Sequence, residues 1–87
     1  MTNGNPRFTH LVQNALESNG VLDDTNEIQY ATKFTAQFES FRAHILVYNT
    51  GKIVVQGRLS PLVTWLGKVK RSIETGKPIP AFEPPID

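Results

Sequence analysis

The chain has 87 residues, enough for one small domain, and its net charge of +1 with 39% hydrophobic and 20% charged residues is ordinary for a globular protein. It contains no cysteine, which excludes disulfides, thiolate metal sites and cysteine nucleophiles. No apolar run approaches the roughly 20 residues that a membrane helix needs, and the polar N-terminal residues do not form a secretory signal. We therefore expect a cytoplasmic protein without a membrane partner.

The N-terminal part of the chain is predicted to form a helix over residues 6–18. Asn5 can cap it with Pro6 at the first helical position, and Asn19-Gly20 supplies a left-handed stop. One apolar stripe recurs at helical spacing and consists of Phe8, Leu11, Val12, Ala15 and Leu16. The acidic segment 21–26 is rich in Asp and Asn, which favour turns, and is predicted to be a loop.

The hydrophobic period changes from near 3.6 to two at Ile28, and this alternation predicts a half-buried strand that runs to Phe38. A second strand is expected over residues 41–48 and a third from 52 to about 58. Asn49-Thr50-Gly51 lies between them, and a three-residue loop with Gly at its third position predicts a type I turn with a G1 bulge.

The length of this loop sets the register of the hairpin. It places Tyr48 opposite Lys52 and Leu46 opposite Val54, whereas a two-residue loop would mix apolar and polar residues on both faces. One face of the hairpin is then uniformly apolar and consists of Ala43, Ile45, Val47, Ile53 and Val55. That face is expected to receive the helices.

A second helix is predicted to begin at Ser60 and Pro61, as N-cap and first helical residue, and to end at Gly76. Its apolar stripe consists of Leu62, Leu66, Val69 and Ile73, with Trp65 at the flank. The expected fold class is α+β: a two-layer sandwich of an antiparallel sheet with helices on one face and the other face open.

This domain is expected to span residues 1–76 and to be followed by a Pro-rich tail over 77–87. The tail either docks onto a partner protein through an aromatic groove or folds back, with Ile79 and Phe82 covering edges of the core. Three cations of the second helix, Lys68, Lys70 and Arg71, are expected to form a solvated face, with phosphate contact as the alternative.

The open sheet face carries the residues that bear on function. Its cations suit phosphates, its tyrosine suits stacking, and its aliphatic side chains suit contacts to bases and sugars. The candidate nucleic-acid-binding residues are Lys33, Arg42, His44, Leu46, Tyr48, Lys52, Val54, Gln56 and Arg58. An uncovered face with apolar residues is also typical of a homodimer or another protein interface, which stays open as the alternative.

Residues 46–57, Leu46-Val47-Tyr48-Asn49-Thr50-Gly51-Lys52-Ile53-Val54-Val55-Gln56-Gly57, resemble the strand–turn–strand hallmark of TATA-binding-protein repeats. They resemble at least as closely the N-terminal substrate-binding domain of bacterial ribonuclease HIII. The resemblance implies binding of DNA or of an RNA/DNA hybrid through the open face, with Leu46, Tyr48, Lys52, Val54 and Gln56 as contacts. This chain holds one such repeat, so a saddle-shaped surface would require a homodimer. A further alternative is an adaptor to a separate nuclease or toxin.

Residues that could support catalysis are scattered. The two histidines, His10 and His44, fall on different elements, and Asp23-Asp24 is an ordinary loop pair. A metal or acid–base site needs three or more convergent groups. Gly51-Lys52 lies in a hairpin and lacks the upstream glycine of a phosphate-binding loop. We therefore expect a binding protein of low sequence specificity, with no catalytic residues, no metal and no cofactor.

Overall fold

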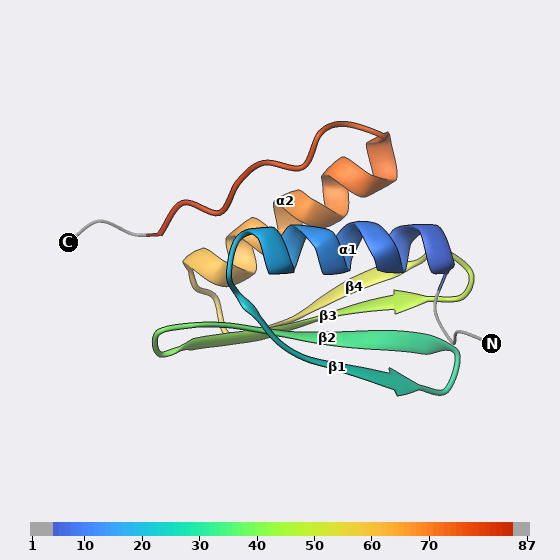
Figure 1. Cartoon of the computed structure of the whole chain (residues 1–87), viewed down its shortest axis with the longest axis horizontal. Helices are drawn as coiled ribbons and strands as arrows, with labels where there is room; N and C mark the ends of the chain where they lie inside the picture. Colours follow the sequence, from blue (N-terminus) through green and yellow to red (C-terminus); the bar gives the residue numbers. More distant parts are fainter. Residues whose placement is uncertain (1–4, 85–87) are drawn as a thin grey trace.

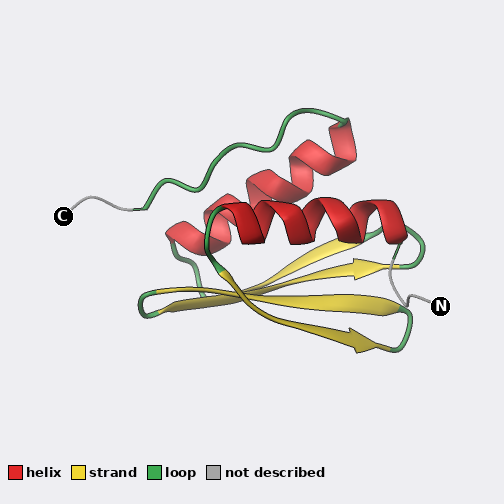
Figure 2. Cartoon of the chain, in the orientation of Figure 1, coloured by secondary structure: helices red, strands yellow, loops and turns green. Residues whose placement is uncertain are grey.

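The computed structural model describes residues 5–84 and contains two helices and four strands. In chain order these are α1 (Pro6–Ser18), β1 (Leu22–Ile28), β2 (Ala31–Phe38), β3 (Phe41–Tyr48), β4 (Ile53–Gly57) and α2 (Pro61–Thr75). The strands form an antiparallel meander in the order β1-β2-β3-β4, and both helices cover the same face of it (Figure 1). The structure thus has the expected two-layer α+β architecture, and the described residues leave one sheet face uncovered (Figure 2).

Both helices begin and end where the capping residues predict. The Asn5 side chain accepts hydrogen bonds from the backbone N–H groups of Arg7 and Phe8, and the Ser60 hydroxyl accepts one from Val63. Gly20 and Gly76, just past the two helices, both adopt a φ of 70°, the left-handed conformation that stops a helix. Local chemistry therefore fixes the length of each helix.

The β3–β4 hairpin has the predicted register. Leu46 pairs with Val54 and His44 with Gln56, and the Tyr48 N–H donates to the Lys52 carbonyl at 2.8 Å. Gly51 has a φ of 93° at the third loop position. The three-residue loop therefore sends the apolar set toward the helices, as expected from the sequence.

The prediction of a loop over residues 21–26 is wrong, because this segment forms the edge strand β1. Five of its seven residues are exposed, so it lacks the apolar alternation by which a strand is recognised. A turn at Gln29-Tyr30 folds β2 back onto it, and Tyr30 has a φ of 67°, rare for a bulky residue. The single strand predicted from Ile28 therefore divides at this turn, and the sheet has four strands within residues 5–84 where three were predicted.

The core lies between the sheet and the helix layer. Phe34 and Ile45 from the central strands, Leu16 from α1 and Leu66 from α2 are all fully buried there. Thr32, on the same face of β2, is 2% exposed, and its hydroxyl has no hydrogen-bond partner in the described part of the chain. That unpaired hydroxyl is a local cost within an otherwise apolar core.

The C-terminal tail folds back over the helix layer, as one of the two alternatives anticipated (Figure 1). Phe82 is buried, with its ring centroid 5.1 Å from Phe38 and 5.4 Å from Trp65. The Trp65 indole N–H donates to the Pro80 carbonyl, and the Phe82 N–H donates to the Asn19 side-chain oxygen, both at 2.8 Å. The tail thus completes the core, and Trp65 is a core residue whose polar atom it satisfies.

Within residues 5–84, no helix has the length and apolar character needed to cross a membrane.

Candidate nucleic-acid interface

The uncovered face of the sheet gathers most of the predicted contact residues. Strand pairing places one residue set on this face: Lys33, Arg42, His44, Leu46, Tyr48, Val54 and Gln56. Lys52 joins them at the turn, because its carbonyl accepts the Tyr48 N–H. Arg58 follows β4 and borders the same hollow as Arg42 at the opposite end of the sheet. The geometry therefore brings the predicted set onto one side of the molecule.

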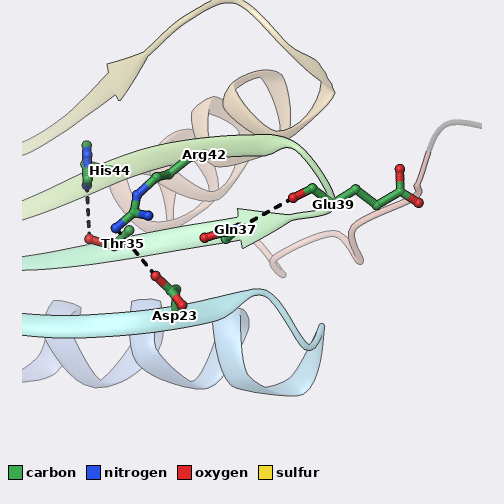
Figure 3. Close-up of polar contacts among 6 residues, drawn as sticks. All are labelled: Asp23, Thr35, Gln37, Glu39, Arg42 and His44. Carbon is green, nitrogen blue, oxygen red and sulfur yellow. Dashed lines mark hydrogen bonds and ion pairs between the residues drawn. The ribbon is translucent and has the colours of Figure 1, made fainter.

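His44 stands in the middle of the face in a row that crosses all four strands. Its row partners are Asp24 on β1, Thr35 on β2 and Gln56 on β4. The Thr35 hydroxyl and His44 Nδ1 are 3.1 Å apart and hydrogen-bonded (Figure 3). Partial burial, with smaller contributions from the charges of Lys33 and Arg42, holds the pKa of His44 below its usual value of 6.5. The imidazole is therefore neutral at pH 7.

Arg42 of β3 forms an ion pair with a residue of the edge strand β1, on the other side of β2. Its guanidinium lies 3.6 Å from the Asp23 carboxylate, and the two side chains approach each other across β2 (Figure 3). The pairing register shifts between Leu22 and Asp24, so Asp23 is the extra residue of a β-bulge in the edge strand. Because both side chains are well exposed, this pair orients Arg42 more than it stabilises the fold.

Leu46 was expected to be an exposed apolar contact, and this expectation is wrong, because the residue is only 5% exposed. It lies in the central strand β3, with Lys33 and Val54 across from it and His44 and Tyr48 beside it along the strand. Neighbours on three strands therefore surround it within the face. The apolar surface that ligands can reach on this face therefore comes from Tyr48 and Val54, together with the half-buried Ile28 in the edge strand.

Charge is divided across the face. Because β1 is a strand, Asp23 and Asp24 lie at one edge of the face, whereas a loop was expected for these residues. Lys52 and Arg58 lie at the other side, beside β4, and Lys33 lies between. The face is consequently less basic than the sequence analysis predicted. An anion would be attracted to its β3–β4 side, because Lys52 and Arg58 lie there and the two carboxylates lie at the opposite edge.

The cations on that side are spread along the strands. Arg42 and Tyr48, at the two ends of β3, are separated by six residue steps, which corresponds to about 20 Å. This length matches roughly six base steps of a B-form strand at about 3.4 Å each. Arg58 with Arg42 at one end and Lys52 at the other can therefore reach phosphates several nucleotides apart.

Gly57, the last residue of the resemblance, has an internal role. A Cβ added there would lie 3.1 Å from the Ala43 Cβ and 3.1 Å from a Val63 methyl carbon, and the residue has a φ of 144°. Its missing side chain lets α2 approach the sheet closely at the start of the helix. This position in the motif is explained by packing rather than by ligand contact.

Comparisons of the chain with protein-family models, curated proteins and solved structures find no match. Within residues 5–84, no group of three or more His, Asp or Glu side chains is arranged to hold a metal ion. The sequence analysis did not place Asp23, Asp24 and Asn26 in the sheet. No sequence pattern marks them as strand residues, and only the pairing of β1 with β2 does so.

Proposed function

We propose that the protein binds nucleic acid, DNA or an RNA/DNA hybrid, along the β3–β4 side of its open sheet face. The observation that carries the proposal is the placement of Tyr48, Lys52, Val54 and Gln56 on one uncovered surface, with Arg58 and Arg42 at its far end. Cations attract phosphates, and a tyrosine ring offers a stacking surface worth about 1–3 kcal/mol per base. The resemblance of residues 46–57 to hybrid- and DNA-binding domains supports the same ligand class.

The proposed contacts are electrostatic and sequence-tolerant. Lys33, Lys52 and Arg58 are not engaged in an ion pair in the described part of the chain, whereas Arg42 is paired with Asp23. Three phosphate contacts correspond to a slope of about −2.7 in a plot of log affinity against log salt concentration. Affinity should therefore fall roughly 40-fold between 50 and 200 mM salt.

The proposal is tested by fluorescence anisotropy with labelled duplex DNA, single-stranded DNA and an RNA/DNA hybrid at several salt concentrations. Lys52→Glu should weaken binding strongly and reduce the salt slope by about 0.9, because one phosphate contact is lost. Lys77→Glu is the matched control, since it makes the same charge change on an exposed residue that follows α2 in the helix layer. Absence of binding to all three ligands at 50 mM salt would refute the proposal, as would an equal effect of both variants.

Val54→Asp separates nucleic-acid binding from self-association through the same face. Val54 is half-buried and lies on the open surface, so the substitution places a carboxylate where a second copy or a base would pack. Sedimentation of the wild-type chain as a 9.7 kDa monomer across micromolar concentrations, together with loss of oligonucleotide binding in the variant, supports the proposed ligand. A wild-type dimer that Val54→Asp converts to a monomer favours a homodimer interface instead.

A further inference from the structure

A concave surface, distinct from the open sheet face, lies between β4 and α2. A groove of about 600 Å³ runs between this strand and α2. Its strand wall includes Lys52, Ile53 and Val55, and its helix wall includes Gly67, Lys70 and Arg71. The groove lies along the free edge of the sheet, because β4 is the last strand of the meander in the described part of the chain.

The edge of β4 offers unpaired backbone groups to this groove. The bond from the Tyr48 N–H to the Lys52 carbonyl marks that pair as a hydrogen-bonded position. Bonded and non-bonded pairs alternate along an antiparallel ladder, so Ile53 and Val55 belong to the non-bonded pairs. Their N–H and C=O groups therefore point away from β3, toward the position of an additional strand.

The groove is strongly basic. Lys52, Lys68, Lys70 and Arg71 line it, against the single carboxylate of Glu74. None of the four cations takes part in an ion pair within residues 5–84. The sequence suggested an ordinary solvated helix face for three of them, but the fold brings these three together with Lys52, from a different element, around one concave surface.

Gly67 lowers the helix wall at the middle of the groove. A Cβ added there would meet no atom within 4 Å, so internal packing does not require a glycine. Glycine inside a helix costs about 1 kcal/mol relative to alanine. Its presence leaves room for another chain to lie close to the helix backbone.

We propose that this groove binds an extended acidic segment of a partner protein, which pairs with β4 as a fifth strand and directs carboxylates toward Lys70 and Arg71. A peptide supplies both donors and acceptors, and so can satisfy the N–H and the C=O of Ile53 and Val55 alike. Phosphate oxygens only accept hydrogen bonds and would leave the two carbonyls unpaired. The β4 edge of a second copy would bring two basic grooves together, which like-charge repulsion opposes.

The inference goes beyond the proposed nucleic-acid binding and does not depend on it, because the groove shares only Lys52 and Val54 with the open face, and its other wall is formed by α2. The two are separable in experiments. Lys70 and Arg71 belong to the groove alone, whereas Lys33 belongs to the open face alone.

The test uses a seven-residue peptide of alternating threonine and glutamate, added to the isotopically labelled full chain and followed by amide NMR. Binding should shift the resonances around β4 and slow hydrogen exchange of the Ile53 and Val55 amides. The same peptide with lysine in place of glutamate should not bind. The double variant Lys70→Glu with Arg71→Glu should weaken binding at least about tenfold, whereas Lys33→Glu with Lys77→Glu, with an equal charge change, should leave it unaltered.

Gly67→Leu provides a second variant that fills the groove without removing charge. It should abolish peptide binding while leaving the protein folded, because leucine is a better helix former than glycine. Any of the following results would overturn the inference: no binding of the acidic peptide, equal binding of the lysine peptide, binding without protection of Ile53 and Val55, or protection of these amides by single-stranded DNA. Protection that rises with protein concentration alone would assign the edge to self-pairing and overturn it too.

Discussion

Removal of the Phe82 ring should destabilise the fold far more than its position in a Pro-rich tail suggests. The side chain is 9% exposed and packs edge-on against Phe38 and beside Trp65. Replacement of a buried Phe by Ala costs about 3–5 kcal/mol. The lower end applies here, because Phe82 lies at the margin of the core, where the tail can partly close the space. We therefore expect Phe82→Ala to lower the free energy of unfolding by about 3 kcal/mol.

A loss of about 3 kcal/mol is large relative to the total stability of such a domain. A domain of 87 residues has a total stability of about 4–13 kcal/mol, so the variant approaches the limit of folding. Its midpoint of thermal unfolding should fall by roughly 10–25 °C. Truncation after Gly76 should cost at least as much, because it also removes Ile79 and the Pro80 carbonyl that accepts the Trp65 indole N–H.

Urea unfolding measures the effect by two signals: fluorescence of Trp65, the single tryptophan, and circular dichroism at far-ultraviolet wavelengths. Glu83→Ala is the matched control, since Glu83 is the exposed neighbour of Phe82 and its loss should change stability by less than about 0.5 kcal/mol. A loss below about 1 kcal/mol for Phe82→Ala, with an unchanged denaturant slope, would show that the tail is not part of the core.

Three further predictions concern the sheet. Thr32→Val removes the unpaired buried hydroxyl and should raise the free energy of unfolding by about 1 kcal/mol in urea titrations; a loss of stability would mean that the hydroxyl has a partner. Gly57→Ala should cost about 2–3 kcal/mol, since it combines a positive φ with close contacts to Ala43 and α2, and a neutral result by the same measurement would contradict the packing role. Because the folded-state pKa of His44 lies below 6.5, the unfolded chain takes up this proton first. The free energy of unfolding should therefore fall as the pH drops from 6.5 toward that lower pKa, and His44 should not affect it above pH 6.5. Urea unfolding at pH 7.5 and 5.5 should show that this loss of stability disappears in His44→Gln and persists in His10→Gln.

The parts of the fold that could be predicted from sequence are those that local chemistry determines. Asn5 and Ser60 cap their helices through their own side chains, and the bulged turn at Gly51 sets the β3–β4 register without help from distant residues. The uncovered face followed from that register. Its chemical composition was predicted from the same pattern, apart from the acidic residues of the edge strand.

The parts that could not be predicted depend on tertiary context. Strand β1 is recognisable only by its pairing with β2, because its exposed Asp and Asn residues have low strand propensity. The turn at Tyr30 uses a left-handed residue that is neither Gly nor Asn, so no turn signal marks it. Leu46 is buried although it lies on the open face, in the central strand β3 with neighbours on both sides, and this depends on which residues the sheet brings beside it. The basic groove combines β4 with α2, and only the folded chain brings them together.

The contact of Gly57 with Ala43 and Val63 bears on how sequence similarity in this hairpin is interpreted. A glycine at the end of such a short pattern indicates that a helix packs closely against the strand. Unrelated proteins in which a helix packs equally closely would have the same glycine. Two homologous chains could therefore keep this glycine while their solvent-facing positions diverge to different ligands. Substitutions at Tyr48 and Lys52 are the informative ones for following a change of binding partner, since no packing constraint of this kind holds them.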